Sequence, residues 1–137
     1  MSVIRIKEIN FGSKDYRKAV TIRKEILRKL LGLNFSKVEL EVEATDFHIT
    51  GFSAETLIGT LVLSPQNEET NRMRQVAVHS DYQKRGFGKQ LVEFSEKFAV
   101  EHEYKIIILH SREDVIPFYT KLGYTVYIIC YSNLVIQ

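Results

Sequence analysis

The 137 residues of this chain have the length and composition of one globular domain. Hydrophobic residues make up 45% and charged residues 26%, which excludes an intrinsically disordered chain. Nineteen basic and 17 acidic residues give a formal net charge of +2, so no overall field attracts the chain to nucleic acid or to a membrane surface. Cys130 is the only cysteine, which excludes an intrachain disulfide and a multi-cysteine zinc site. The first residues do not resemble a signal peptide and no apolar run reaches the ~18 residues of a membrane span, so we expect one cytoplasmic α/β domain over residues 1–137.

The first half of the chain predicts a strand, a helix and a hairpin. Residues 3–7 predict the first strand, and Ser13 is expected to cap a helix whose apolar residues recur at helical spacing to about residue 31. The pattern over 35–43 allows a short second helix. From residue 46 the period changes to two, and strands near 47–51 and 56–64 are predicted to form an antiparallel hairpin.

The second half predicts a strand–helix–strand unit. Alternation predicts a strand over 73–79, and Leu91, Phe94 and Phe98 form the apolar stripe of the following helix. The apolar run at 106–109 is typical of a strand covered on both faces. The two strands are therefore expected to be parallel, with a right-handed crossover. A shorter helix over 115–122, with Pro117 in its first turn, and a last strand over 124–131 complete the prediction.

The loop before the long helix has the residues of an anion-binding site. It reads Gln83-Lys84-Arg85-Gly86-Phe87-Gly88. Glycines let an anion approach the backbone, the first-turn amides of the helix are free, and Lys84, Arg85 and Lys89 add full charges. The pattern predicts a phosphate or pyrophosphate site; the alternative is an ordinary turn with solvated basic residues. No Gly-Lys-Ser/Thr follows, and a leucine takes the third position of the dinucleotide glycine pattern.

Two motifs around this unit resemble the GNAT superfamily of acetyl-CoA-dependent N-acetyltransferases. Gln83, Gly86 and Gly88 match its Q/R-x-x-G-x-G/A motif, and Phe118-Tyr119-Thr120-Lys121-Leu122-Gly123-Tyr124 matches its F-Y-x-x-x-G-F/Y signature. The resemblance covers roughly residues 73–124. Residues 22–27, IRKEIL, and residues 109–113, LHSRE, are further similar to a bacterial branch of small GNAT proteins.

The resemblance implies a mixed central sheet flanked by helices, whose fourth and fifth strands splay apart at their C-terminal ends to admit acetyl-CoA. The pantetheine arm would pair with the fourth strand like an extra strand, and the pyrophosphate would lie on the amides of residues 84–89. No metal is expected. The residues expected to contact acetyl-CoA are Gln75, Val76, Ala77, Val78, Gln83, Lys84, Arg85, Gly86, Phe87, Gly88, Lys89, Ser111 and Phe118.

The implied reaction is direct transfer of the acetyl group to a primary amine of a small molecule or peptide in a ternary complex. Tyr119 occupies the family position of the acid that protonates the leaving thiolate; the alternative is a core aromatic residue. His110 is our first candidate for the base, because its ordinary pKa suits neutral pH; the alternative is a strand-end histidine that packs or bonds to backbone. Many relatives carry a glutamate early in the fourth strand; the matching position here is near Arg72, with no carboxylate close by. Further candidates for lining an acceptor pocket are Glu25, Glu41, Glu43 and His48, and His79 is expected to be structural.

The C-terminal end of the chain bears on both the assembly and the activity of the protein. Only 13 residues follow Tyr124, whereas relatives usually continue through a further paired strand, so the C-terminal strands are expected to be shortened. The apolar residues of 127–131 and 134–136 then predict a homodimer through this edge. The alternative is that the tail folds back as a short hairpin and caps its own sheet. A shortened acceptor site also allows a non-catalytic acyl-CoA-binding module. Nucleic-acid binding is disfavoured, because the basic residues are few and no aromatic platform accompanies them.

Overall fold

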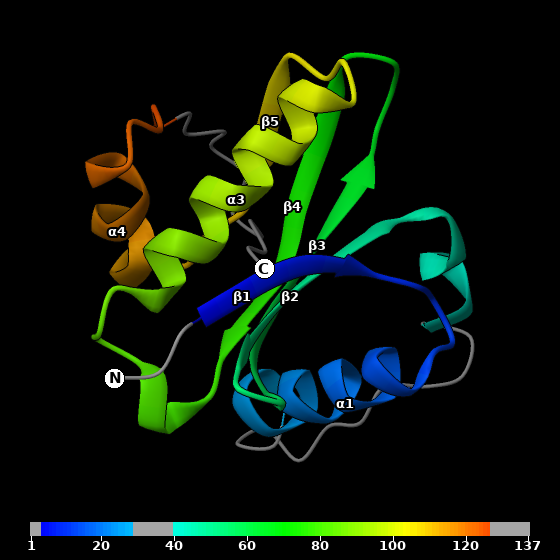
Figure 1. Ribbon diagram of the computed structural model, residues 1–137. Helices are drawn as coiled ribbons and strands as arrows, with labels where there is room; N and C mark the ends of the chain where they lie inside the picture. Colours follow the sequence, from blue (N-terminus) through cyan, green and yellow to red (C-terminus); the bar gives the residue numbers. More distant parts are fainter. Residues whose placement is uncertain (1–3, 29–39, 127–137) are drawn as a thin grey trace.

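The computed structural model describes residues 4–28 and 40–126. Its centre is one mixed five-stranded sheet in the order β1-β2-β3-β4-β5 (Figure 1). Neighbouring strands from β1 to β4 are antiparallel, and β4 and β5 are parallel as predicted. The strands are β1 (Ile4–Ile9), β2 (Phe47–Ser53), β3 (Thr56–Pro65), β4 (Thr70–Val78) and β5 (Ile106–Leu109).

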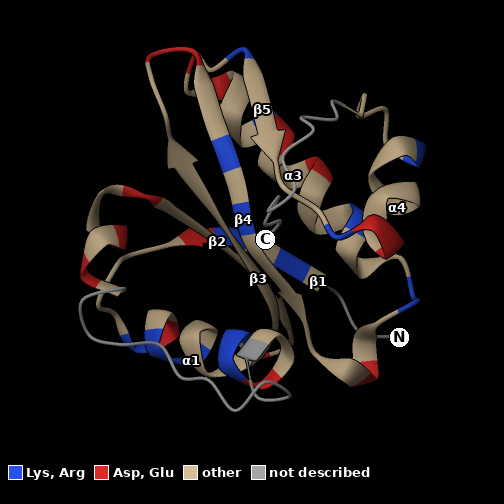
Figure 2. Cartoon of the chain, turned by 180° about the vertical axis from the view of Figure 1, so that it is seen from behind, with Lys and Arg blue, Asp and Glu red and all other residues tan. Residues whose placement is uncertain are grey.

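Helices cover the two faces of the sheet (Figures 1 and 2). Helix α3 (Phe87–Glu101) crosses one face, and α1 (Lys14–Arg23) packs on the other, near the ends of β3 and β4. Helix α4 (Ile116–Lys121) follows β5 and a 3-10 turn, η5 (Glu113–Val115). Together with the sheet order, this arrangement confirms the α/β class and the mixed central sheet flanked by helices.

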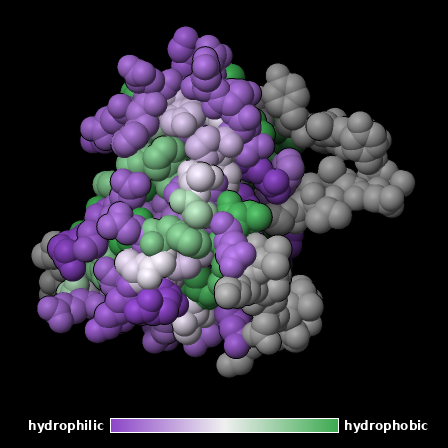
Figure 3. Space-filling model, turned by 90° about the vertical axis from the view of Figure 1, so that its right-hand side faces the viewer, coloured by the Kyte–Doolittle hydropathy of each residue, from purple (hydrophilic) through white to green (hydrophobic). Residues whose placement is uncertain are grey.

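Two apolar clusters hold these layers together. Under α3, side chains of the helix such as Leu91 pack on Ile49, Leu63 and Met73 of the strands. On the other face, Ala19 and Ile22 of α1 pack with residues that include Phe52 and Ala77. Figure 3 shows hydrophobic residues in a band across the middle of one side, between more hydrophilic ends.

The N-terminal helix begins where the sequence predicts. The Ser13 hydroxyl accepts a hydrogen bond from the Tyr16 amide at 3.1 Å, which caps α1. After Arg23 the chain makes a π-helical turn, η1 (Lys24–Arg28), and the predicted continuation to residue 31 lies outside the described residues. Of the short helix predicted over 35–43, only residues 40–43 are described; they lead into a 3-10 turn, η3 (Val42–Thr45).

The predicted coverage of β5 on both faces is wrong. Ile106 is 48% exposed and Ile108 is 41% exposed, whereas Ile107 and Leu109 pack on the cluster under α3. The reason is that, among the described elements, α1 packs mainly on β3 and β4, and the face of β5 that carries Ile106 and Ile108 is left exposed. The prediction of a strand over 124–131 also fails for residues 124–126, which are not in a strand. Residues 127–137, which the predicted dimer contact involves, lie outside the described residues.

Candidate functional site

The parallel pairing of β4 with β5 stops halfway along β4. Four residue pairs run from Thr70–Ile106 to Met73–Leu109, and β4 then continues to Val78. Gln75 has a left-handed φ of 56°, and three steps on β4 from Arg74 to Ala77 match two steps on β3. This extra residue is a β-bulge, which bends a strand and increases its twist. Within the described part of the chain, no strand therefore pairs with residues 75–78 on the side of β5.

The glycine loop lies directly after this unpaired segment. A 3-10 turn, η4 (Ser80–Tyr82), follows β4, and the Gln83 side-chain amide donates to the Val78 carbonyl at 2.8 Å. Lys84 and Gly86 both have left-handed φ values, 62° and 81°, and Gly86 is the N-cap of α3. Glycine is favoured at such a position because it has no Cβ. The Gln83 side chain thus holds the loop against the end of β4.

The N-terminus of α3 is open to an anion. Gly86 offers no side-chain cap and the first turn has no acidic residue, so the helix dipole and the first-turn amides are not neutralised there by a carboxylate. Lys84 and Lys89 are exposed. Arg85 is exposed too, but its guanidinium donates to the Asp81 carbonyl at 3.0 Å and lies 5.0 Å from the centre of the Tyr82 ring.

Two residues of the predicted loop site have packing roles. Phe87 is 3% exposed, and a Cβ on Gly51 or Gly59 would come within 2.3 Å or 2.4 Å of its ring. Phe87 can therefore offer a ligand its backbone amide, whereas its side chain is committed to the core. A Cβ on Gly88 would lie 3.6 Å from the Phe118 ring, which places the start of α3 beside α4.

Tyr119 lies on α4, close beneath the surface. It is 9% exposed, its ring centre is 5.0 Å from that of Phe118 and 5.7 Å from that of Tyr124, and Pro117 lies in the first turn of α4 as predicted. Burial raises the pKa of Tyr119 to about 12, so the hydroxyl is protonated at neutral pH. Among the described residues, the hydroxyl of the neighbouring Tyr124 is buried without a hydrogen-bond partner.

His110 directly follows β5 at the point where β4 and β5 part. Its side chain is exposed, and partial burial together with the positive charge of Arg72 lowers its pKa. The imidazole is therefore neutral at pH 7 and can accept a proton. Ser111, the next residue, donates its hydroxyl hydrogen bond to the Arg112 carbonyl at 2.9 Å.

The candidates for an acceptor pocket separate into a buried group and an exposed group. Glu43 accepts two hydrogen bonds from Arg23, at 2.8 and 2.6 Å, and one from the Tyr16 hydroxyl at 3.0 Å. Burial alone would raise the pKa of Glu43, but the hydrogen bonds and charge of Arg23 outweigh it and hold that pKa below its ordinary value. His48 is buried with Nε2 3.0 Å from the Glu43 carbonyl oxygen. The idea that Glu43 and His48 line an acceptor pocket is therefore wrong: both are buried in this network.

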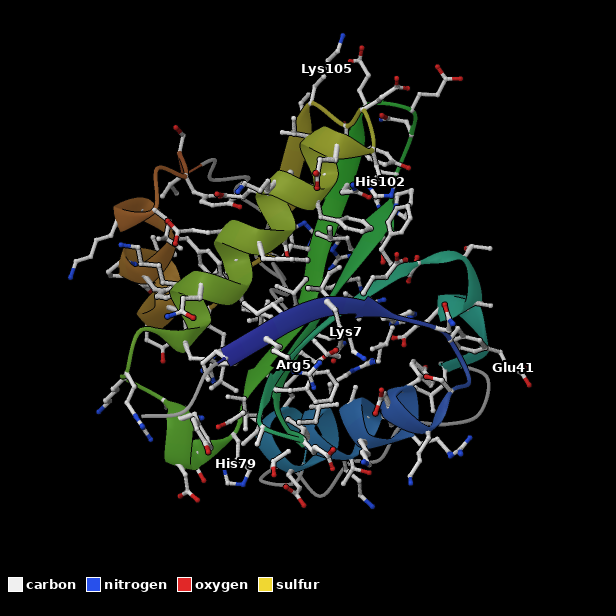
Figure 4. All side chains as sticks on the ribbon, in the orientation of Figure 1. Arg5, Lys7, Glu41, His79, His102 and Lys105 are labelled. Atoms are coloured by element: carbon white, nitrogen blue, oxygen red, sulfur yellow. The ribbon has the colours of Figure 1, made fainter. Side chains whose placement is uncertain are left out.

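The remaining candidates from the sequence lie at the surface. Glu25 and Glu41 are exposed, and Glu41 extends outward from the molecule in Figure 4. His79 lies at the opposite end of β4 from β5, and its Nδ1 accepts a hydrogen bond from the Asp81 amide at 3.1 Å. This contact caps η4 and agrees with the structural role expected for His79.

A pocket of about 400 Å³ opens beside Arg72 and Arg74, on the face of the sheet opposite α3. Asp46 and Ser64 also line it. Figure 2 shows basic residues along β4 and acidic residues in the segment before β2. Sequence reasoning did not identify this pocket. The signal was the placement of two arginines two residues apart on a strand, which puts both on one face.

No group of His, Cys, Asp and Glu in the described ranges could hold a metal ion. In the same ranges, no helix has the length and apolarity that would let it cross a membrane.

Solved structures from several organisms have the same fold. A Lactobacillus plantarum protein described as a candidate N-acetyltransferase aligns with a TM-score of 0.79 and 23% identity, over 95% of this chain and 90% of that one. A GNAT family acetyltransferase from Elizabethkingia anophelis, solved with acetyl-CoA bound, aligns with a TM-score of 0.71 and 22% identity, over 91% of this chain and 78% of that one.

A curated relative matches over a shorter stretch. The tRNA(Met) cytidine acetyltransferase TmcA of Aeropyrum pernix is 41% identical over 54 residues, which are 39% of this chain and 8% of that protein. The chain thus spans less than a tenth of the length of this relative. The family model described as "Acetyltransferase (GNAT) family" matches residues 24–124, a range that contains β4, β5, the glycine loop and Tyr119. This chain belongs to the GNAT acetyltransferase family.

Proposed function

We propose that the chain binds acetyl-CoA between β4 and β5 and transfers its acetyl group to a primary amine. The observation that carries the proposal is the unpaired part of β4, residues 75–78, which ends at the open N-terminus of α3. An extended arm with amide groups can pair with such a strand edge, and a pyrophosphate suits a helix N-terminus. Membership of the family and the related structure with bound acetyl-CoA support this assignment.

In this proposal, the backbone and the side chains of the glycine loop make different contacts with the pyrophosphate. Backbone amides from Lys84 to Gly88 hydrogen-bond the phosphate oxygens, while Lys84 and Lys89 supply the charges that are least engaged elsewhere. Arg85 is oriented by its contacts with Asp81 and Tyr82. The left-handed conformation of Gly86 fits this role, because any side chain there would be strained and would crowd the anion.

The reaction requires the acceptor to lose protons and the leaving sulfur to gain one. An alkylammonium with an ordinary pKa of about 10.4 costs roughly 4 to 5 kcal/mol to deprotonate at pH 7. His110, neutral at this pH, accepts a proton from the acceptor nitrogen. As the new C–N bond forms and the C–S bond breaks, the Val76 amide stabilises charge on the carbonyl oxygen. Tyr119 donates its hydroxyl proton to the sulfur, and the second proton that the nitrogen loses restores this hydroxyl. The products are an amide, a free thiol and the proton taken up by His110.

A non-catalytic acyl-CoA-binding module is the second candidate function. This function is favoured because no carboxylate is available as a base at the positions where one would be expected. Glu43 is held by Arg23, and the resemblance places the glutamate of many relatives near Arg72, where this chain has no carboxylate base. The match to TmcA spans too little of that protein to extend its tRNA acceptor to this chain.

One experiment separates the two functions. Calorimetry measures the binding of CoA, and release of free thiol from acetyl-CoA is followed with polyamines, amino sugars, amino acids and peptides as acceptors. Acceptor-dependent thiol release supports the transferase. CoA binding with no turnover on any amine supports the binding module. If CoA does not bind, the proposed use of the β4–β5 edge is wrong.

A further inference from the structure

The pocket beside β4 contains an arginine whose charge is balanced by none of the carboxylates in the described ranges. Arg72 and Arg74 extend from the same face of β4 and both line the pocket of about 400 Å³. Their surroundings differ, although they are only two residues apart. This difference indicates what kind of molecule the pocket accepts.

The charge of Arg74 is balanced by carboxylates. One of its terminal nitrogens lies 3.6 Å from Glu43 and 3.6 Å from Asp46, and 3.5 Å from the Ser64 hydroxyl. Glu43 is already paired with Arg23 at 2.6 Å. In this cluster, Glu43 and Asp46 thus compensate the charges of Arg23 and Arg74, and nothing is left over for a third cation.

That third cation is Arg72. Its Nε is buried and has no hydrogen-bond partner, and none of the described carboxylates lies within ion-pair distance of its guanidinium. A half-buried guanidinium with free donors in a pocket is costly unless a ligand completes it. Its planar set of donors fits a carboxylate or a phosphate, which it can bind through two parallel hydrogen bonds.

Arg72 also lies close to the proposed reaction centre. It pairs with Ile108 on β5, and His110 follows two residues later, roughly 7 Å along a strand. The charge of Arg72 contributes to the lowered pKa of His110, in agreement with this proximity. One small molecule could therefore place its anionic group at Arg72 and its amine at His110.

We propose that Arg72 binds an anionic group of the acceptor, so that the substrates are primary amines that carry a carboxylate or a phosphate. The part of this inference that concerns acceptors rests on the proposed transferase function. The part that concerns anion binding at Arg72 does not. A second ammonium group at the same place would be repelled by Arg72, so polyamines are expected to be poor acceptors. Amino acids and phosphorylated amino sugars are the two sources of this chemistry.

The first test measures the anion site without any acetyl transfer. Inorganic phosphate is titrated into the protein saturated with CoA, which fills the glycine loop, and the Arg72 side-chain N–H resonance is followed by NMR. We expect a saturable shift at Arg72, and we expect phosphate affinity measured by calorimetry to fall about tenfold or more in Arg72→Gln, which is about 1.4 kcal/mol. Arg5→Gln, which removes an exposed arginine on β1, is the matched control and should bind phosphate like the wild type.

The second test measures the preference among acceptors. Each of two matched pairs differs only in the anion: an amino acid and its amide, and an amino-sugar phosphate and the free amino sugar. In the wild type, kcat/KM should favour the anionic member of at least one pair, and the pair that shows it identifies the source. In Arg72→Gln this ratio should fall about tenfold or more, and Arg72→Lys, which keeps the charge and loses the planar donors, should restore part of it.

The possible results separate this inference from the function on which it rests. Equal kcat/KM for both members of each pair, or an unchanged ratio in Arg72→Gln, overturns the anionic acceptor while acetyl transfer stands. If CoA does not bind, the transferase proposal is wrong, and the phosphate titration on the protein alone still decides whether Arg72 is an anion site. No shift at Arg72 under either condition overturns that site.

Discussion

Arg23 and Glu43 form a bidentate ion pair in the interior, with hydrogen bonds of 2.8 and 2.6 Å across 20 residues of sequence. Arg23 ends α1 and Glu43 lies in η3, so the pair ties the first helix to the segment that leads into β2. Glu43 also accepts a hydrogen bond from the Tyr16 hydroxyl, and its carboxylate lies 3.6 Å from a terminal nitrogen of Arg74. The same carboxylate thus supports both the packing of α1 and the position of one pocket arginine.

Removing the Glu43 carboxylate should destabilise the whole domain. Glu43→Gln removes the carboxylate that pairs with the buried Arg23 side chain, and breaking such a pair costs about 3–5 kcal/mol. Urea unfolding followed by circular dichroism measures the loss. Lys18→Gln, an exposed change on α1, is the control and should leave the unfolding midpoint nearly unchanged. A loss below about 1 kcal/mol in Glu43→Gln would show that the pair contributes little to the fold.

The same pair should make stability depend on acid pH. The pKa of Glu43 is lower in the folded protein than in the unfolded chain, where it is about 4.3. Its contribution is therefore complete above about pH 4.3 and is lost as the pH falls through the folded value. Unfolding free energies of the wild type and Glu43→Gln, measured from pH 7 to pH 3, should converge as the pH falls. Parallel curves over this range would contradict the assignment.

The left-handed glycine at the start of α3 should be essential for CoA binding. Gly86→Asp adds a strained side chain and a negative charge where the phosphates are expected, so affinity for CoA should fall about tenfold or more. Gly12→Asp is a matched control, because Gly12 also has a left-handed φ, 78°, and lies just before the N-cap of α1. Calorimetry compares the two variants. Similar CoA affinity in both would remove the glycine loop from the binding site.

The Tyr119 hydroxyl should matter for turnover and little for binding. Tyr119→Phe keeps the ring packed against Phe118 and Tyr124 but removes the proton donor, so kcat should fall about 100-fold or more while the Kd of acetyl-CoA stays close to the wild-type value. Tyr104→Phe, at the far end of the sheet beside Phe47, is the control. A rate equal to that of the wild type, with a chemical step that limits turnover, would leave Tyr119 a packing residue.

A side chain at Gly51 or Gly59 should lower the stability of the protein, because the Phe87 ring occupies the space that it would need. A Cβ at either position would come within 2.3–2.4 Å of the Phe87 ring, so Gly59→Ala should cost about 1–3 kcal/mol of stability through overpacking. In the double variant with Phe87→Leu, the two losses should be clearly less than additive, because the smaller side chain makes room. Full additivity in urea unfolding would show that the methyl group is accommodated elsewhere.

Local signals in the sequence were enough to predict most elements. Alternation predicted the β2–β3 hairpin, Ser13 predicted the start of α1, and the strand–helix–strand order predicted the parallel pairing of β4 with β5. Each of these depends on neighbours in the sequence or on a general rule of chain connection. The glycine loop lies where its motif predicted, directly before α3.

The errors concern contacts between distant segments. Glu43 reads as a surface charge until α1 brings Arg23 against it. An apolar run cannot show that α1 packs mainly on β3 and β4, so the exposed face of Ile106 and Ile108 was not foreseen. That no carboxylate in the described ranges balances the charge of Arg72 likewise becomes visible only once Glu43 and Asp46 are seen to be engaged by other arginines.

The extra residue at Gln75 changes the parity of β4. In a regular strand, Arg74 and Ala77 would lie on opposite faces because they are three residues apart. The bulge places them on the same face, since Arg74 pairs with Val62 and Ala77 with Thr60. The side chain of Ala77 can therefore pack with α1 on the face that also carries Arg74. One inserted residue thus decides which face of the sheet each residue after it occupies, in the same stretch of β4 that no described strand pairs with on the side of β5.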